Sequence, residues 1–149
     1  KKGLVFRPEW YEKYIFPLYP KLWEPIKQAG KRVIFVADGN MSPFLEKLKE
    51  TGVDGVMLEN PATPLNEIFR VFGDGIVIGG MNTGLLTFGS PKEIRREVIE
   101  LHKRTKDLSG FAISSPGGLH GNIPFENFKA YFDARVEAGY TPRGWQKID

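Results

Sequence analysis

The sequence predicts an α/β fold built from four parallel β/α units, and three observations support this prediction. Four short apolar runs recur along the chain, beginning near residues 33, 54, 75 and 111. A stretch with helical spacing of apolar residues follows each run, and polar or turn-forming residues separate the two. Near-continuous apolar strands that alternate with helices are typical of a parallel sheet.

Length and composition favour one globular domain over residues 1–149. Hydrophobic residues make up 41% of the chain and charged residues 26%, which are ordinary values for a globular protein. The 21 Lys and Arg residues exceed the 18 Asp and Glu residues by only three, and the two signs are interleaved. Without a basic stripe or a stacking motif, we expect no nucleic-acid partner.

Two absences narrow the chemistry further. The chain has no cysteine, which excludes disulfides, Cys-ligated zinc, iron–sulfur clusters and Cys nucleophiles within these residues. No apolar run approaches the ~20 residues that span a bilayer. We therefore expect no membrane partner and a cytoplasmic location.

Residues 8–29 precede the first strand and have helical spacing. Pro17, Pro20 and Pro25 fall inside this segment, so we expect at least one interruption of the helix. The first strand is expected over residues 32–37. Ser42 can cap the helix that follows, and the proline after it suits the first helical position. Together they predict a helix start.

The remaining three units repeat this pattern. Residues 53–58 form the second expected strand, and Thr63 before a proline again predicts a helix cap. Residues 75–80 form the third expected strand. The main helix after it begins at a capping box whose first residue is Ser90. Residues 111–115 form the fourth, followed by a Gly-rich loop and a last helix that starts at Pro124.

Four such units are compatible with two architectures. They could form a small open doubly wound sheet with a ligand at its switch point. They could equally form half of a (β/α)₈ barrel, which takes eight units and leaves both edge strands of a half unpaired. Composition and periodicity do not decide between them.

In either architecture the functional end of the sheet is the carboxyl end of its strands. Polar or ionisable residues follow all four strands, while the strand interiors are apolar. We expect His120 and Asp38 to be catalytic, because both follow strand ends and His120, in the Gly-rich loop, belongs to a residue type that often acts as general acid or base. The expected substrate-binding residues are Asn40, Glu59, Asn82 and Ser115. Each also has a purely structural interpretation as a cap or turn residue.

The ordered segments resemble the uroporphyrinogen decarboxylase superfamily over roughly residues 4–140. They include Val33–Asn40, Gly52–Gly55, Gly79–Thr83, Gly89–Ile94, Ser115–Gly118 and Pro124–Asn127. The resemblance implies a TIM barrel, of which this chain is similar to the second, C-terminal half. It also implies that the Arg and Asp residues that bind the substrate in the decarboxylases belong to an N-terminal half that is absent from this chain.

The resemblance implies different chemistry for two branches of the superfamily. Decarboxylases carry Gly-His-Gly near the last strand, and the matching position here is Gly117, with His120 three residues later. In corrinoid-dependent methyltransferases, a zinc ion bound by His and Cys side chains activates a thiol. The positions here that match those ligands are Val36, Asp38 and Gly118. We therefore expect no metal and no cofactor in this chain, with a corrinoid possible as substrate.

Three functions remain open on these grounds. The Ser115–Gly118 frame looks more like the methyltransferase branch, so methyl transfer from a methylated corrinoid or small methyl donor ranks slightly ahead. Porphyrin-pathway decarboxylation is the first alternative, and non-catalytic binding of a tetrapyrrole or other small ligand is the second. The expected partner is the missing half-barrel or a second copy of the chain, and whether the isolated chain is an enzyme is left open.

Overall fold

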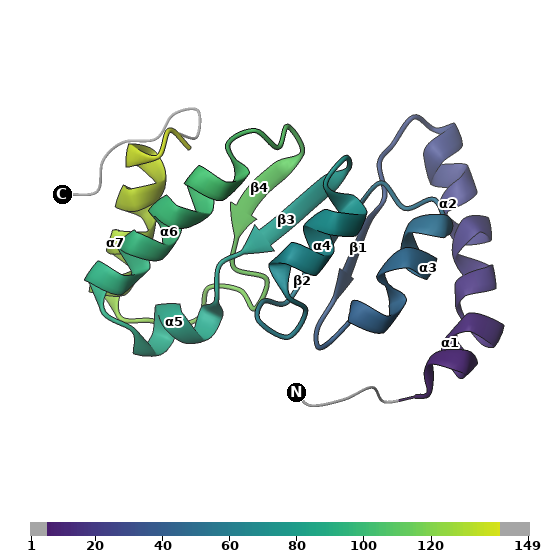
Figure 1. The fold of residues 1–149 in the computed structure, drawn as a ribbon, viewed down its shortest axis with the longest axis horizontal. Helices are drawn as coiled ribbons and strands as arrows, with labels where there is room; N and C mark the ends of the chain where they lie inside the picture. Colours follow the sequence, from purple (N-terminus) through teal and green to yellow (C-terminus); the bar gives the residue numbers. More distant parts are fainter. Residues whose placement is uncertain (1–5, 141–149) are drawn as a thin grey trace.

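The computed structural model describes residues 6–140 and contains one sheet of four parallel strands (Figure 1). The strands are β1 (Ile34–Ala37), β2 (Gly55–Leu58), β3 (Ile76–Gly80) and β4 (Phe111–Ser114). They lie side by side in chain order, β1-β2-β3-β4. A doubly wound sheet reverses its strand order at a switch point, and this sheet does not. The α/β prediction is confirmed, and the strand order is that of a barrel segment.

Helices precede, connect and follow the strands. They are α1 (Pro8–Tyr14), the 3₁₀ turn η1 (Phe16–Leu18), α2 (Tyr19–Gln28), the 3₁₀ turn η2 (Ser42–Phe44), α3 (Leu45–Glu50), α4 (Leu65–Phe72), α5 (Thr83–Phe88), α6 (Pro91–Thr105) and α7 (Phe125–Glu137). The expected interruption of residues 8–29 falls at η1, while Pro25 lies inside α2. The short helix α5 was not expected from the sequence.

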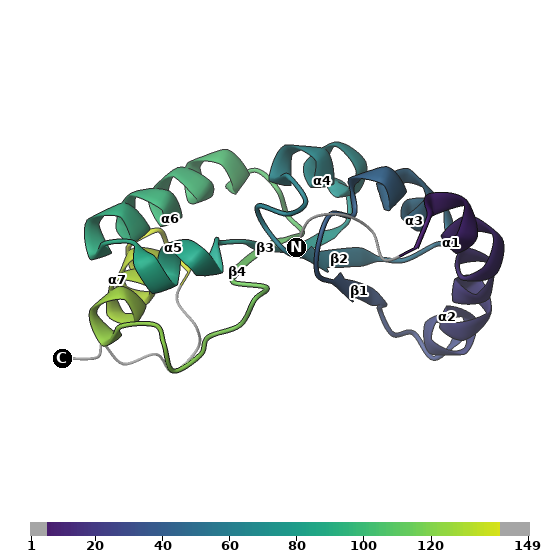
Figure 2. The ribbon, with the colours of Figure 1, turned by 90° about the horizontal axis from the view of Figure 1, so that it is seen from below.

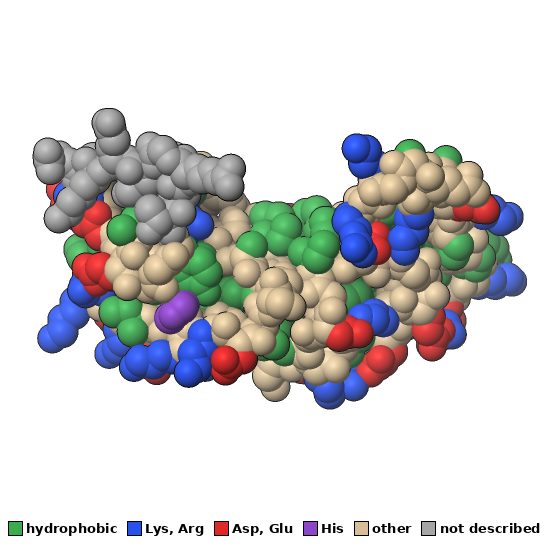
Figure 3. Space-filling view, turned by 90° about the horizontal axis from the view of Figure 1, so that it is seen from above, with side chains coloured by type: hydrophobic (Ala, Val, Ile, Leu, Met, Phe, Trp, Pro, Cys, Tyr) green, Lys and Arg blue, Asp and Glu red, His purple; other side chains and the backbone are tan. Residues whose placement is uncertain are grey.

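The helices cover one face of the sheet and leave the other face open. Figure 2 shows α3, α4 and α6 on the same side of the strands. Val56, Val77 and Ile113 point to that side and are at most 4% exposed. On the opposite face Val36 is 62% exposed. Figure 3 shows hydrophobic side chains in the hollow between the two ends of the molecule.

Of the three predicted side-chain caps, one is present and two are absent. The last helix starts at Phe125, with Pro124 at its N-cap position, one residue later than predicted. Ser90 caps α6 in a complete capping box with Glu93. Ser42 makes no side-chain cap, because a 3₁₀ turn precedes α3 and displaces the start of that helix. Thr63 is also not a cap, since α4 starts after Pro64 without a side-chain cap and the Thr63 hydroxyl bonds elsewhere.

Asp54 joins the beginnings of β1 and β2 and the end of α2. Its Oδ2 accepts a hydrogen bond of 2.8 Å from the backbone N–H of Val33. Its Oδ1 lies 3.5 Å from Lys27 Nζ and 3.4 Å from Arg32 Nη1. The Val33 N–H and the two cations lower the pKa of the Asp54 carboxyl group below its ordinary value.

The substitution Asp54→Asn should therefore destabilise the fold in a pH-dependent way. A carboxyl group whose pKa is lower in the folded state stabilises the protein above its unfolded pKa of about 3.9, and this stabilisation is lost as the pH falls through the folded value. Losing charge-assisted hydrogen bonds should cost about 2 kcal/mol at pH 7. Urea unfolding at pH 7 and near pH 3 should show a smaller pH dependence for the variant than for the parent chain.

Asp74→Asn provides the matched control. The Asp74 side chain is 78% exposed and pairs with Lys49 on the surface, where an ion pair contributes little to stability. If both substitutions changed the unfolding midpoint equally at pH 7, the role assigned to Asp54 would be wrong.

Candidate functional site

The polar residues that follow the four strands gather at one edge of the sheet. All four arrows in Figure 1 point toward the same end of the molecule, because every strand pair is parallel. Figure 2 looks onto this edge. We call it the carboxyl edge, and all six residues nominated from the sequence lie in the loops that follow the strands.

Two carboxylates occupy neighbouring strand ends. Ala37 of β1 is in register with Leu58 of β2, so Asp38 and Glu59 follow at equivalent positions on adjacent strands. Glu59 Oε2 accepts a hydrogen bond of 3.2 Å from the backbone N–H of Gly39. Gly39 has φ +83°, a conformation that favours glycine, and this turn directs its N–H toward β2. The Glu59 carboxylate therefore lies beside the residue that follows Asp38.

Thr63 stabilises the same turn through its side-chain hydroxyl. It is fully buried, and its Oγ1 donates to the Gly39 carbonyl at 2.9 Å and accepts from the Met41 N–H at 2.8 Å. Asn40, which lies between these two residues, is exposed, and its Oδ1 accepts from the Ser42 N–H at 2.9 Å. The loop after β1 is thus held by the loop after β2.

Hydrogen bonds continue along the carboxyl edge to β3 and β4. Asn60 Nδ2 donates to the Gly80 carbonyl at 2.9 Å, which joins the ends of β2 and β3. The Met81 N–H donates to the Ser114 carbonyl at 3.0 Å. Each strand end is therefore bound to the next, and the edge is a single connected structure.

Asn82 and Ser115 have structural partners here. Asn82 caps α5, and its Oδ1 accepts from the Gly84 N–H at 2.8 Å. Ser115 is 6% exposed, and its hydroxyl lies 2.6 Å from Thr83 Oγ1. Both side chains thus help to place α5 and the loop after β4.

His120 lies in that loop, on the exposed surface. Its carbonyl accepts a hydrogen bond of 3.0 Å from the Ile123 N–H, which closes the loop before α7. Gly117, three residues earlier, packs against Thr83, and a Cβ atom there would lie 2.4 Å from Thr83 Oγ1. A side chain at position 117 would therefore require the Thr83 side chain or the loop to shift.

The sequence predicted the carboxyl edge but not the structural role of three residues that connect its loops. Glu59, Asn40 and Asn82 accept hydrogen bonds from loop backbones, and Ser115 bonds to Thr83. Asn60, Thr63 and Thr83 hold the loops together. Nothing in their local sequence distinguishes them from turn residues, because their partners lie 20 to 32 residues away.

A thiolate zinc site does not fit the residues present. Val36 and Gly118, at two of the three corresponding positions, have no side-chain donor atom for a metal. Within residues 6–140, no group of three or more His, Cys, Asp or Glu side chains could hold a metal ion. In the same part of the chain, no helix has the length and apolar character needed to cross a membrane.

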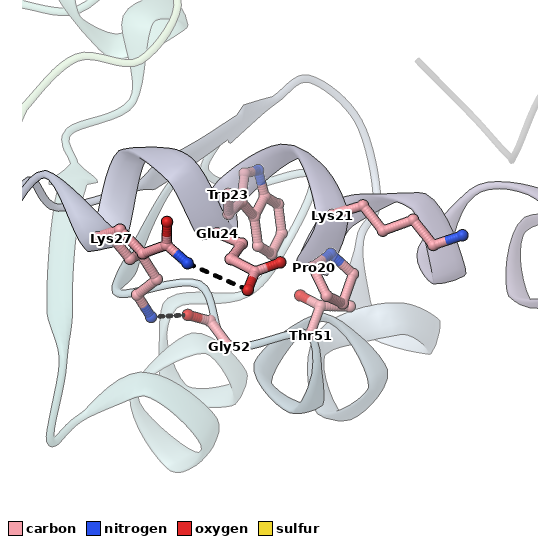
Figure 4. Close-up of a pocket in the computed structure, with 8 residues that line it drawn as sticks. Pro20, Lys21, Trp23, Glu24, Lys27, Thr51 and Gly52 are labelled. Atoms are coloured by element: carbon pink, nitrogen blue, oxygen red, sulfur yellow. Dashed lines mark hydrogen bonds between the residues drawn. The ribbon is translucent and has the colours of Figure 1, made fainter.

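A surface hollow of about 560 Å³ lies between α2 and the turn that follows α3. Figure 4 shows Lys27 pointing to the Gly52 carbonyl, and Glu24 beside it on the same helix. Thr51 and Gly52 precede β2 rather than follow it. This hollow is therefore at the opposite end of the sheet from the carboxyl edge.

Comparisons with known proteins agree with this geometry. The family model described as "Uroporphyrinogen decarboxylase (URO-D)" matches residues 2–138. A uroporphyrinogen decarboxylase from Thermus thermophilus is 32% identical over 123 residues, which cover 82% of this chain and 35% of that protein. One from Prochlorococcus marinus is 29% identical over 126 residues, covering 83% and 35%. The methylcobamide:CoM methyltransferase MtbA of Methanosarcina acetivorans is 27% identical over 123 residues, covering 81% and 34%.

The resemblance seen in the sequence is therefore confirmed at the level of the family. The chain spans about a third of the length of the curated relatives that it matches. Since the family fold is a TIM barrel, four parallel strands in chain order are a segment of one. The chain belongs to the uroporphyrinogen decarboxylase family and represents part of its barrel.

Proposed function

We propose that this chain supplies part of a barrel active site that binds a tetrapyrrole-like substrate and removes CO₂ from an acetate side chain. The observation that carries the proposal is the pair of carboxylates, Asp38 and Glu59, at the ends of two adjacent strands. Several relatives are uroporphyrinogen decarboxylases, which supports the same reaction class.

The carboxylates suit the electronic demands of this reaction. When the carbon–carbon bond to the carboxyl group breaks, CO₂ leaves and the bonding electron pair passes to a protonated pyrrole. A proton then adds to the methylene carbon, which becomes a methyl group, and the pyrrole ring releases the proton that it had gained. Asp38 and Glu59 would stabilise the cationic ring electrostatically, while the Gly39 N–H holds the Glu59 carboxylate in place.

The open face of the sheet suits the body of such a substrate. Val36, Met57, Ile78 and Ala112 are register partners on successive strands, and none of the four is buried. They form an apolar row just below the carboxyl edge. A large ring with polar substituents fits an apolar surface that has a few charged groups at its rim.

Methyl transfer is the second candidate. The Ser115–Gly118 loop resembles the methyltransferase branch, and one relative is the methyltransferase MtbA. The loop supplies no thiolate ligand, so any activation of the acceptor would have to come from another part of the protein. Assays of the polypeptide that contains this chain, with uroporphyrinogen and with methylcobalamin plus a thiol, separate the two reactions. Methyl transfer without CO₂ release would refute the decarboxylase proposal.

Glu59→Gln should reduce decarboxylation by about tenfold or more, because a neutral amide stabilises a cationic ring less well. Product formation from uroporphyrinogen by the assembled barrel is the measurement. Glu100→Gln is the control, since Glu100 lies on the outer surface of α6 and pairs with Lys103. If both variants matched the parent rate, Glu59 would not be a substrate-stabilising residue.

His120→Ala should also lower turnover, because His120 could transfer a proton at the carboxyl edge when its loop turns inward. The chain contains one other histidine, His102, whose ring packs against Tyr140 beside α6. His102→Gln should retain the parent rate. Unchanged turnover in His120→Ala would remove His120 from the site.

A further inference from the structure

We propose that Thr63 is a positioning residue for the candidate site: its buried hydroxyl fixes the backbone that follows β1 and thereby the placement of Asp38 beside Glu59. The inference deepens the proposed function and rests on it, because it concerns the two carboxylates assigned to the reaction there. Thr63 acts through other residues and not on the substrate, since it is fully buried.

The partners of the Thr63 hydroxyl indicate a role beyond local structure. A buried hydroxyl is costly unless hydrogen bonds satisfy it. The buried Thr105 meets this requirement inside its own helix, where its Oγ1 donates to the Leu101 carbonyl at 2.8 Å. Thr63 instead bonds to residues 22 and 24 positions away, in the loop that follows β1. Its hydroxyl therefore joins two loops, and it does not cap α4, the helix that follows it.

The two loops meet at Gly39, which is held from both sides. Its N–H donates to Glu59 Oε2 at 3.2 Å, and its carbonyl accepts from Thr63 Oγ1 at 2.9 Å. Peptide bonds are planar, so the N–H lies in the plane shared with Asp38 and the carbonyl in the plane shared with Asn40. Fixing these two planes fixes φ and ψ of Gly39, the two soft torsions of its backbone. Since glycine has the least restricted backbone of all residues, these two bonds determine how the loop turns.

Thr63 fixes a third peptide plane as well. Its Oγ1 accepts from the Met41 N–H at 2.8 Å, and this N–H lies in the plane that joins Asn40 to Met41. Three successive planes, from Asp38 to Met41, are therefore bonded to the loop after β2, two of them by one hydroxyl. The backbone of Asp38 is then fixed on both sides, because Ala37 before it is paired in the sheet.

The two side chains that hold the β1 loop are themselves joined. The Thr63 N–H donates to the Glu59 carbonyl at 2.9 Å, which closes the turn between them. Glu59 directly follows Leu58, the last residue of β2. The turn from Glu59 to Thr63 and the turn from Asp38 to Met41 therefore form one unit. Within this unit, the placement of Asp38 relative to Glu59 depends on the Thr63 hydroxyl.

Catalysis is more sensitive to this placement than substrate binding is. Electrostatic stabilisation of a transition state requires charges that are already in position, and a misplacement of about 1 Å can lower a rate about 100-fold. The apolar row assigned to the body of the substrate lies on the strands and not in these loops. Loss of the Thr63 hydroxyl should therefore lower kcat and leave KM nearly unchanged.

The test compares Thr63→Val, Thr63→Ser and Thr105→Val in the polypeptide that contains this chain. Thr63→Val keeps the shape of the side chain and removes both hydrogen bonds, whereas Thr63→Ser keeps the hydroxyl. With uroporphyrinogen as substrate, Thr63→Val should lower kcat by about tenfold or more, with KM within about twofold of the parent. Thr63→Ser should keep kcat within about threefold.

Thr105→Val is the matched control. Thr105 is 2% exposed and ends α6, before β4 begins, so it lies at the opposite end of the sheet from the carboxyl edge. The substitution removes a buried hydroxyl of the same kind and should retain the parent kcat. It separates a loss of stability from a loss of positioning.

Amide hydrogen exchange gives a second result that does not depend on any reaction. Thr63→Val leaves Glu59, the partner of the Gly39 N–H, in place. If the two turns form one unit, the Gly39 amide should nevertheless exchange at least about tenfold faster in Thr63→Val than in Thr63→Ser. The Val77 amide of β3, which donates to the Gly110 carbonyl, is the internal reference for a change in global stability.

A lower kcat with faster Gly39 exchange, both restored in Thr63→Ser, would support the inference. Gly39 exchange at the parent rate would overturn it, and so would faster exchange with an unchanged kcat. An equal loss of kcat in Thr63→Val and Thr105→Val, or a failure of Thr63→Val alone to fold, would make Thr63 a purely structural residue and overturn the inference. If the parent released no CO₂, the proposed function would fail, and the exchange rates would then decide whether Thr63 fixes the loop.

Discussion

The parallel pairing of four strands in chain order is the constraint on which the other features depend. It brings the carboxyl ends of all four strands to one edge, so the loops that carry residues 38 to 120 begin at that edge. It also separates the two faces of the sheet, because the connecting helices all lie on one of them. The open face, with exposed Val36 and Ala112, has the character of a barrel interior.

Hydrogen bonds at the carboxyl edge divide its polar residues into two groups. Asn60, Thr63, Asn82 and Ser115 bind loop atoms and keep the strand ends together. Asp38, Asn40 and His120 are exposed, and Glu59 uses one oxygen for the Gly39 N–H. The chemistry that this chain can offer is therefore concentrated at the ends of β1 and β2 and in the loop after β4.

The sequence predicted the parts of the fold that depend on neighbouring residues. Strand runs and the Ser90 capping box are local patterns, and both appear at the expected places. Thr63 has the same local pattern as a cap, yet a buried hydroxyl gains more by bonding the Gly39 loop, 24 residues away. Helix α5 and the Thr83–Ser115 contact also depend on the meeting of distant segments. Periodicity carries no information about such contacts, so these features required the structure.

The loop after β4 shows how this chain departs from both branches of its family. In the resemblance, the position of the decarboxylase histidine matches Gly117, where an added Cβ atom would lie 2.4 Å from Thr83 Oγ1. A methyltransferase ligand position is Gly118, which has no metal-binding atom. The loop thus lacks the defining group of either reaction, although its frame is retained.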